Sequence, residues 1–228
     1  MSLADQLQEG LAALGLDLPA AMQSKLLGYV ALLKKWNGTY NLTAIRDERD
    51  MVTQHLLDSL SVLPGLSESA LAGPRSGIPV TQSEGRQSPG RRWADVGSGA
   101  GLPGIPLAIV RPDIDMTLIE AVAKKSAFQR QAKIELGLSN IAVVSGRVEA
   151  LPGGLFDAVV SRAFADLTDF VRLAGHLLAQ NGRLYAMKGL APEAEMSRLP
   201  PGWAVLDCVR LNVPGLDAQR HLVVLERV

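Results

Sequence analysis

The sequence predicts an α/β protein in which a helical extension precedes a mostly parallel sheet that is covered by helices on both faces. Two observations predict this class. From Arg92 onward, short apolar runs alternate with helix-like stretches, a pattern typical of parallel sheets. A glycine-rich turn follows the first apolar run, at a position where open α/β sheets bind ligands.

Residues 1–66 are predicted to form a helical extension. Pro19 suits the start of the second helix, and Pro64-Gly65 marks the end of the last one. Apolar residues at three- and four-residue spacings place one face of each helix in a core: Leu7, Leu11 and Leu14, then Leu26, Leu27, Val30 and Leu33, then Leu56, Leu57, Leu60 and Leu63.

Residues 67–91 are predicted to be a flexible linker or insertion. The segment mixes Gly, Pro, Ser and charged residues and has almost no periodic apolar signal. We expect it to be a solvated loop without a role of its own.

Residues 92–228 are predicted to form a domain built on seven strands. The first five strands are expected at 93–96, 116–119, 141–144, 158–160 and 183–187, with helices at 124–136 and 167–178 between them. Two further apolar runs, at 204–211 and 221–226, flank Pro214-Gly215. A reversed hairpin at the sheet edge would account for this pair.

Length and composition exclude several classes of protein. The 228 residues suffice to bury a full sheet, and no apolar run approaches the ~18 residues of a membrane span. The first residues do not read as a signal peptide, and the single cysteine, Cys208, cannot form an internal disulfide. We therefore expect a cytoplasmic monomer with no membrane association. The net charge is zero, so charge alone gives no support for nucleic-acid binding.

The glycine-rich turn, which begins at Gly97, is the strongest local signal. Glycines allow positive φ and let a ligand approach the backbone. Pro103 and Pro106 fit only if they occupy the first turn of the following helix, where no amide donor is required. Gly99, Gly101 and Gly104 also match the spacing of a dinucleotide turn, but that match alone is weak.

Two acidic residues indicate which ligand the turn holds. Asp95 lies two residues before Gly97, where a carboxylate can meet a cationic amino-acid group but would repel a pyrophosphate. S-adenosylmethionine (AdoMet) carries an ammonium and a sulfonium and no phosphate, so Asp95 favours AdoMet over NAD. Glu120 follows the second strand, where a carboxylate accepts hydrogen bonds from ribose hydroxyls. Both ligands contain an adenosine ribose, so Glu120 predicts a nucleoside without choosing between them.

Polar residues also follow the later strands. Ser145 to Glu149 could border an adenine, and the segment from Ser161 to Phe164, together with Lys188-Gly189, faces the expected substrate side. With three histidines and one cysteine, no zinc site is expected. The cluster of lysines and arginine from Lys124 to Lys133 is expected to be a solvated helix face.

The combined motifs resemble the glucose-inhibited division protein B, or RsmG, family of small-subunit ribosomal RNA methyltransferases. The resemblance covers most of the chain. It is carried by Trp36-Asn37-x-x-x-Asn41-Leu42-Thr43, His55-x-x-Asp58-Ser59-Leu60, the turn DVGSGAGLPGIPLAIVRPD at 95–113, Ser145-x-Arg147-Val148-Glu149, Ser161-Arg162-Ala163-Phe164 and Met187-Lys188-Gly189. The 67–91 segment is longer than expected for the family.

This resemblance implies a Rossmann-like class I AdoMet-dependent methyltransferase that methylates N7 of one guanine in 16S ribosomal RNA, either naked or in a small-subunit particle. It implies that the cofactor contacts Gly97, Leu102, Val148, Glu149 and Arg162. The physical argument adds Asp95, Gly99 and Glu120. Guanine N7 carries no proton, so no general base is expected, and we assign Arg162 and Lys188 to orienting the substrate through guanine O6 or a phosphate.

Other interpretations stay open at this point. Arg162 and Lys188 could instead pair with local carboxylates. The His55 and Asp58 pair, with Asn37 and Asn41, is expected to make structural hydrogen bonds within the helical extension. The alternative functions are an AdoMet enzyme with another substrate, an NAD-dependent oxidoreductase, and a non-catalytic nucleotide-binding regulator of cell division.

Overall fold

The computed structural model describes residues 1–66, 91–162 and 164–228. The predicted linker lies outside these residues, except for Arg91, which is the first residue of strand β1. None of the helices in the described ranges is both long and apolar enough to pass through a membrane.

The helical extension begins with two helices whose ends are defined by their sequence. Helix α1 (Leu3–Ala13) starts at a capping box in which Ser2 and Asp5 bond each other's backbone amides. Helix α2 (Ala20–Tyr40) starts after Pro19, as predicted, and ends at Asn41, whose φ of 49° is left-handed. Both helices turn their leucines inward.

A continuous helical segment then runs from 48 to 60, in three parts. These are α3 (Glu48–Met51), a π-helical stretch η1 (Val52–Leu57) and α4 (Asp58–Leu60). In the π-helical part the amide of Asp58 bonds the carbonyl of Thr53, five residues back. Such π-helical turns are rare and occur frequently at functional sites.

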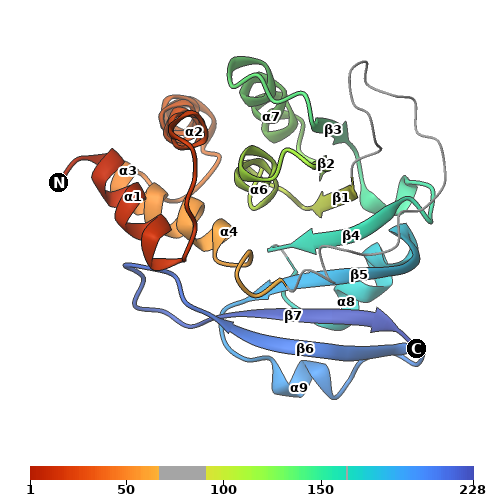
Figure 1. Cartoon of the computed structure of the whole chain (residues 1–228). Coiled ribbons are helices and arrows are strands. Elements are labelled where there is room, and N and C mark those ends of the chain that lie inside the picture. The colour runs from red at the N-terminus through yellow and green to blue at the C-terminus, as the bar shows by residue number, and fades with distance from the viewer. Residues whose placement is uncertain (67–90, 163) are drawn as a thin grey trace.

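The remaining chain forms a seven-stranded sheet in the order β3-β2-β1-β4-β5-β7-β6 (Figure 1). The strands are β1 (Arg91–Val96), β2 (Ile114–Glu120), β3 (Ile141–Ser145), β4 (Phe156–Ser161), β5 (Leu178–Lys188), β6 (Trp203–Leu211) and β7 (Arg220–Arg227). The first five are parallel to one another, and β7 pairs antiparallel with both β5 and β6. This confirms the predicted seven strands and the reversed hairpin at the edge.

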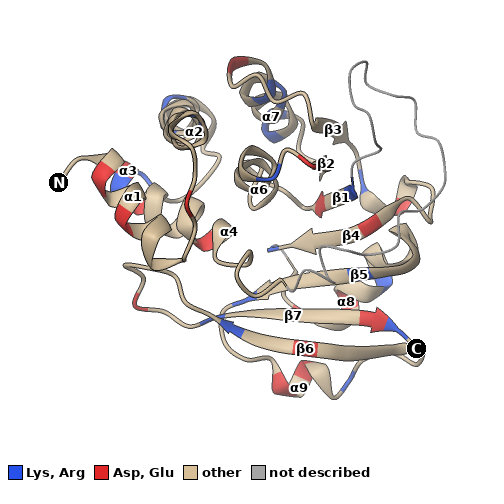
Figure 2. Ribbon diagram, in the orientation of Figure 1, with Lys and Arg blue, Asp and Glu red and all other residues tan. Residues whose placement is uncertain are grey.

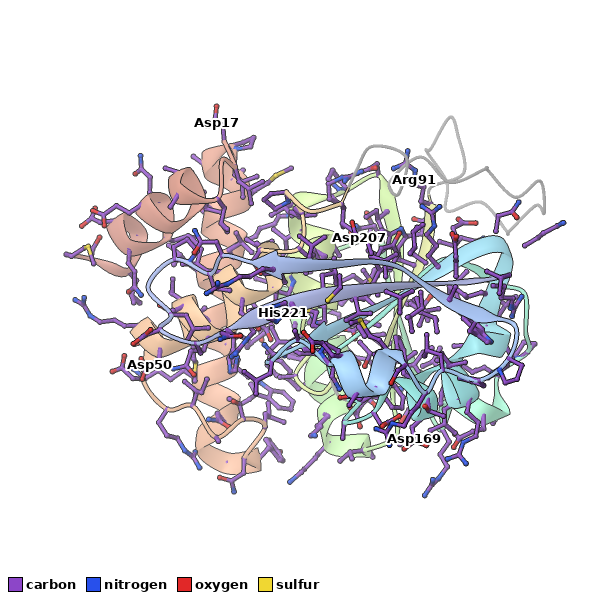
Figure 3. All side chains as sticks on the ribbon, turned by 90° about the horizontal axis from the view of Figure 1, so that it is seen from below. Asp17, Asp50, Arg91, Asp169, Asp207 and His221 are labelled. Atoms are coloured by element: carbon purple, nitrogen blue, oxygen red, sulfur yellow. The ribbon has the colours of Figure 1, made fainter. Side chains whose placement is uncertain are left out.

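Helices cover both faces of the sheet, as predicted. On one face, α6 (Gly104–Val110) and α7 (Ala123–Glu135) share a core with the helical extension. On the other face, α8 (Leu167–Ala174) packs with the 3-10 turns η2 (Val148–Ala150) and η3 (Gly175–Leu177), and α9 (Glu193–Met196) lies beyond it. Seen from below, the helical extension and the sheet lie side by side (Figure 3).

The predicted helix over 167–178 is α-helical only as far as Ala174, and residues 175–177 continue it as the 3-10 turn η3. Helix α8 ends at Ala174, and Leu178 already belongs to β5. Gly175 lies directly under the Trp203 ring of β6, where an added Cβ would come within 2.7 Å of the ring. This contact between distant segments fixes the chain where the local pattern favours a longer helix.

Candidate functional site

The glycine-rich turn lies between β1 and α6, at the carboxyl ends of the parallel strands. Gly97 and Gly99 have φ values of 68° and 58°, which favour glycine. The amides of Gly97 and Ser98 both donate to the carbonyl of Ile119 at the end of β2, at 3.0 and 3.3 Å. The turn is therefore fixed to the neighbouring strand. Pro103 and Pro106 occupy the start of α6, as predicted.

Asp95 lies beneath this turn and is fully buried. Its Oδ2 accepts a hydrogen bond of 2.8 Å from the amide of Gly104, while Oδ1 is buried and has no partner among the described residues. Burial raises the pKa of Asp95 to about 7, against the lowering effect of the Gly104 amide. With no exposed surface, Asp95 holds the turn from below, which differs from the direct contact with a ligand ammonium that we expected.

Glu120 fastens the turn from the side. Its Oε2 accepts from the amide of Gly99 and its Oε1 from the amide of Val122, both at 2.8 Å, and only 6% of the residue is exposed. The carboxylate of Glu120 also contributes to the raised pKa of Asp95. Two acidic groups therefore lie close together under the turn.

Two further side chains that the sequence reasoning missed hold the same turn. Gln129 of α7 is fully buried and donates to Ser98 Oγ and to the Gly99 carbonyl, both at 2.8 Å. Tyr29 of α2 is also fully buried, and its hydroxyl donates to the Ala100 carbonyl at 2.7 Å. Both residues stand at inward positions of their helices, where the sequence pattern indicates only core packing.

A cavity of about 190 Å³ opens over the turn. It brings together four of the predicted cofactor residues, namely Gly97, Gly99, Leu102 and Arg162. The opposite wall comes from the helical extension, through Leu42, Thr43 and His55. Asp95, Glu120, Val148 and Glu149 do not line it. Val148 is buried and Glu149 is exposed in η2, after the neighbouring strand β3, so their contact with a cofactor stays a prediction.

A second cavity of about 390 Å³ adjoins the first, and both are lined by His55 and Arg162. Arg162 and Lys188, the predicted substrate-side residues, both line it. Its remaining lining is Ile45, Gln54, Asp58, Met187, Gly189 and Arg220. The site thus consists of two adjoining hollows, one over the glycine turn and one lined by three cations.

Asp58 links two of these cations. Its side chain is 1% exposed, and its two oxygens accept from Arg162 Nη1 and Arg220 Nε, each at 2.8 Å. Arg162 also donates to the Gln54 carbonyl of the π-helical turn at 3.2 Å. Arg220, at the start of β7, was not predicted, because nothing in its local sequence connects it with a segment 162 residues earlier.

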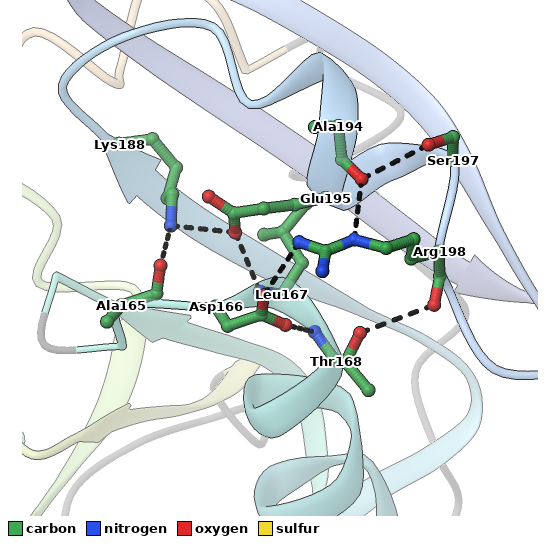
Figure 4. Close-up of polar contacts among 9 residues, drawn as sticks. All are labelled: Ala165, Asp166, Leu167, Thr168, Lys188, Ala194, Glu195, Ser197 and Arg198. Atoms are coloured by element: carbon green, nitrogen blue, oxygen red, sulfur yellow. Dashed lines mark hydrogen bonds and ion pairs between the residues drawn. The ribbon is translucent and has the colours of Figure 1, made fainter.

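Lys188 is held at the end of β5. Its Nζ donates to the carbonyl of Ala165 at 2.6 Å and to Glu195 Oε2 of α9 at 2.9 Å (Figure 4). Glu195 also accepts from the amide of Leu167 at the start of α8. The alternative that Arg162 and Lys188 pair with local carboxylates is therefore what the structure shows, and both residues line the second cavity as well.

His55 lies between the two cavities as a neutral side chain. Its Nδ1 lies 3.0 Å from the Gln54 carbonyl and its Nε2 lies 2.9 Å from Thr43 Oγ1. Burial, and then the nearby charge of Arg162, lower the pKa of His55 to about 4. Asn37 holds the adjoining loop by bonding the Thr43 amide and the Ile45 carbonyl. Asn37 and His55 thus make the expected structural hydrogen bonds within the extension. Asp58 does not, because its side chain bonds Arg162 and Arg220 outside the extension, and His55 and Asp58 do not bond each other.

No group of three or more His, Cys, Asp or Glu side chains suited to a metal ion occurs among residues 1–66, 91–162 and 164–228.

Comparison with known proteins extends this description. The family model described as rRNA small subunit methyltransferase G (GidB) matches residues 22–73 and 76–223. Two similar proteins, both called ribosomal RNA small subunit methyltransferase G, come from Azoarcus sp. (strain BH72) and from Neisseria meningitidis serogroup C (strain FAM18). The first is 52% identical and covers 98% of this chain and 96% of its own, and the second is 51% identical over the full length of both chains.

Solved structures show the same fold at lower sequence similarity. TrmN from Thermus thermophilus has a TM-score of 0.50 and 24% identity, covering 61% of this chain and 45% of that one. A variant of the 16S rRNA (adenine(1408)-N(1))-methyltransferase from Catenulisporales acidiphilia has a TM-score of 0.51 and 17% identity, covering 60% and 85%. The sheet and its helices thus have the class I methyltransferase fold.

Proposed function

Because this chain belongs to the rRNA small subunit methyltransferase G family, we propose that it transfers a methyl group from AdoMet to N7 of one specific guanine in 16S ribosomal RNA. The AdoMet-dependent methylation of small-subunit ribosomal RNA follows from the family. The choice of N7 is our inference. The observation that supports the proposed transfer from AdoMet to RNA is the pair of adjoining cavities. One lies over a glycine turn, the other is lined by cations, and the two share His55 and Arg162.

The first cavity suits AdoMet. Gly97 and Gly99 present backbone without side chains, and a Cβ added at Gly99 would meet nothing closer than 3.9 Å, so the space above it is open. The amide of Ala100 donates to no other described residue, so it is a candidate donor to the cofactor. Leu102 and Arg162 complete this wall, and we place Val148, Glu149 and Glu120 around the nucleoside. When bound, AdoMet supplies a methyl group on a positively charged sulfur.

The electrostatics under the turn favour a cationic ligand over a dinucleotide. Asp95 and Glu120 are both nearly inaccessible and lie close enough to raise the pKa of Asp95. A buried carboxylate acts over several ångströms, so it attracts an ammonium or sulfonium and repels a pyrophosphate. Asp95 contributes only part of a charge near neutral pH, because its pKa is about 7. The acidic residues therefore still favour AdoMet over a dinucleotide, although Asp95 lies beneath the turn and does not contact the ligand.

The second cavity suits the target base. Guanine N7 has a free lone pair, so the chain has no proton to remove, and its task is to align and desolvate the base. Arg162 and Lys188 can orient guanine through O6 or an adjoining phosphate. His55 is neutral at pH 7 and both its ring nitrogens are engaged, which suits a wall of the site better than a proton carrier. We assign the protein to the cytoplasm, as a monomer.

The proposal is tested with labelled AdoMet and unmodified 16S ribosomal RNA, supplied either naked or in a small-subunit particle. We expect label on a single guanine, at N7, as shown by mass spectrometry and by chain cleavage specific for N7-methylguanine. Label at another atom would contradict the N7 assignment. Absence of label on either substrate would favour a non-catalytic regulator.

A further inference from the structure

Helix α7 carries four cations within 13 residues. Its 13 residues include Lys124, Lys125, Arg130 and Lys133 but only one acid, Glu135, which accepts from Gln131. In the part of the chain that the structure describes, none of these four cations forms a hydrogen bond or an ion pair. By contrast, Arg111 and Arg172 have carboxylate partners in Asp113 and Asp169. In a chain of net charge zero, α7 therefore concentrates uncompensated positive charge (Figure 2).

The helix that carries these cations also holds the glycine turn of the site. Gln129, on the buried side of the same helix, holds Ser98 and Gly99 of the glycine turn. The helix begins three residues after Glu120, whose carboxylate bonds the same turn. Lys124 and Arg130 thus stand at exposed positions, and Lys125 and Lys133 at partly exposed positions, of the helix whose buried side supports the cofactor cavity.

Two of the lysines lie at positions where their charge does not stabilise the helix. Lys124 and Lys125 lie in the first turn, which contains no acid, and Val122 at the N-cap gives no side-chain hydrogen bond. The N-terminal end of a helix is its positive end, so lysines there oppose the helix dipole. A purely structural role would prefer acidic residues at these positions.

We propose that the outer side of α7 is a second RNA-binding surface, which holds backbone phosphates of the strand that carries the target base. The inference rests on the proposed function, which supplies a polyanionic substrate. Charge complementarity carries it, because uncompensated lysine and arginine side chains bind phosphates without reading sequence. It also explains how a chain with no net charge binds RNA, since its positive charge is local.

The test uses the full chain and an unmodified 16S ribosomal RNA transcript. Two variants, Lys124→Gln/Lys125→Gln and Lys124→Glu/Lys125→Glu, are compared with Arg111→Gln/Arg172→Gln, which changes the net charge as the first variant does but alters paired arginines. RNA binding is measured by fluorescence anisotropy over a range of salt concentrations, AdoMet binding by calorimetry, and Tm by thermal unfolding.

We expect the two α7 variants to bind RNA more weakly and to lose about 1.4 to 1.8 from the slope of log K against log salt, as for two lost phosphate contacts. AdoMet affinity should stay unchanged. The Glu variant should also raise Tm, because it reverses the unfavourable charges in the first turn. Weaker RNA binding with a higher Tm cannot come from a loss of folding.

An unchanged salt slope in the α7 variants, or an equal loss in the arginine control, would overturn the inference. Failure of the proposed function gives a different result. In that case the wild-type chain transfers no methyl group to the RNA, whatever the binding slopes of the variants.

Discussion

At the scale of single residues, Asp95 and His55 contribute to the pH dependence of stability with opposite signs. Asp95 has a pKa raised to about 7, so the folded chain keeps a proton that the unfolded chain loses above pH ~4. Its contribution therefore lowers stability as pH rises from ~4 to 7. His55 has a pKa lowered to about 4, so the unfolded chain binds the extra proton below pH ~6.5, and stability is lost as pH falls. The two slopes partly cancel in the wild-type chain.

Replacing Asp95 by Asn should reveal this balance. Asn keeps an oxygen to accept from the Gly104 amide but does not ionise. The stability of Asp95→Asn relative to wild type should therefore grow between pH 4.5 and 7.5, by an amount on the order of 3 kcal/mol. Urea unfolding at several pH values measures it. A constant difference between the two proteins across that range would show that Asp95 is not a buried titrating group.

Arg162 belongs to the site and to the stability of the fold at once. Arg162→Ala should lower kcat/KM for RNA methylation about 10- to 100-fold, since a hydrogen bond from a charged donor is lost. Unfolding free energy should fall by only about 1 to 3 kcal/mol, because Asp58 keeps Arg220 as a partner. Arg172→Ala, an exposed arginine on α8, is the matched control and should change neither quantity. Wild-type turnover in Arg162→Ala would remove Arg162 from the substrate side.

At the scale of elements, α6 depends on a close approach to the sheet at its first residue. A Cβ added at Gly104 would lie 2.4 Å from Leu118 Cδ2 and 2.8 Å from Asp95 Oδ2. Gly104→Ala should therefore separate α6 from β2, lower stability by about 1 to 3 kcal/mol and weaken AdoMet binding. Gly38→Ala in α2 is the control, because nothing lies within 4 Å of its added Cβ, and it should stabilise the chain slightly. Calorimetry and thermal unfolding compare the two, and equal effects would contradict this account of α6.

The elements that were predicted correctly are those whose signal is local. Strands β1 to β4 follow from short apolar runs, and the start of α6 follows from Pro103 and Pro106. The early end of α8 depends on Trp203, a residue distant in the chain, so the local pattern could not show it. The same reason hid Arg220, Gln129 and Tyr29, whose partners are far away in sequence. The sequence position of Asp95 was informative, but its complete burial appears only in three dimensions.

At the scale of the whole molecule, the helical extension and the sheet share one hydrophobic core. Leu7, Leu26 and Leu56 of the extension belong to the same buried cluster as Ile105 of α6 and Leu118 of β2. The extension also supplies the wall of the first cavity that faces the glycine turn. The division into residues 1–66 and 92–228 therefore separates sequence patterns, and we predict that it does not separate independently folding units.

Removing residues 1–66 should consequently prevent folding of the rest. The remaining fragment, 67–228, would expose the apolar side of α6 and its neighbours, which the extension normally covers. We expect the fragment to aggregate, to lack a cooperative thermal transition and to bind a hydrophobic dye, with the full chain as the control. A fragment that unfolds cooperatively as a monomer would show instead that the sheet domain is autonomous.

The two cavities have His55 and Arg162 in common, so we predict that a ligand in one cavity changes the affinity of the other cavity for its ligand. When one ligand favours the arrangement of these side chains that the other also requires, the second ligand binds more tightly. Linkage then requires reciprocity: the factor by which RNA tightens the cofactor equals the factor by which the cofactor tightens RNA. We therefore expect titrations of AdoMet with and without RNA, and of RNA with and without AdoMet, to show the same increase in affinity.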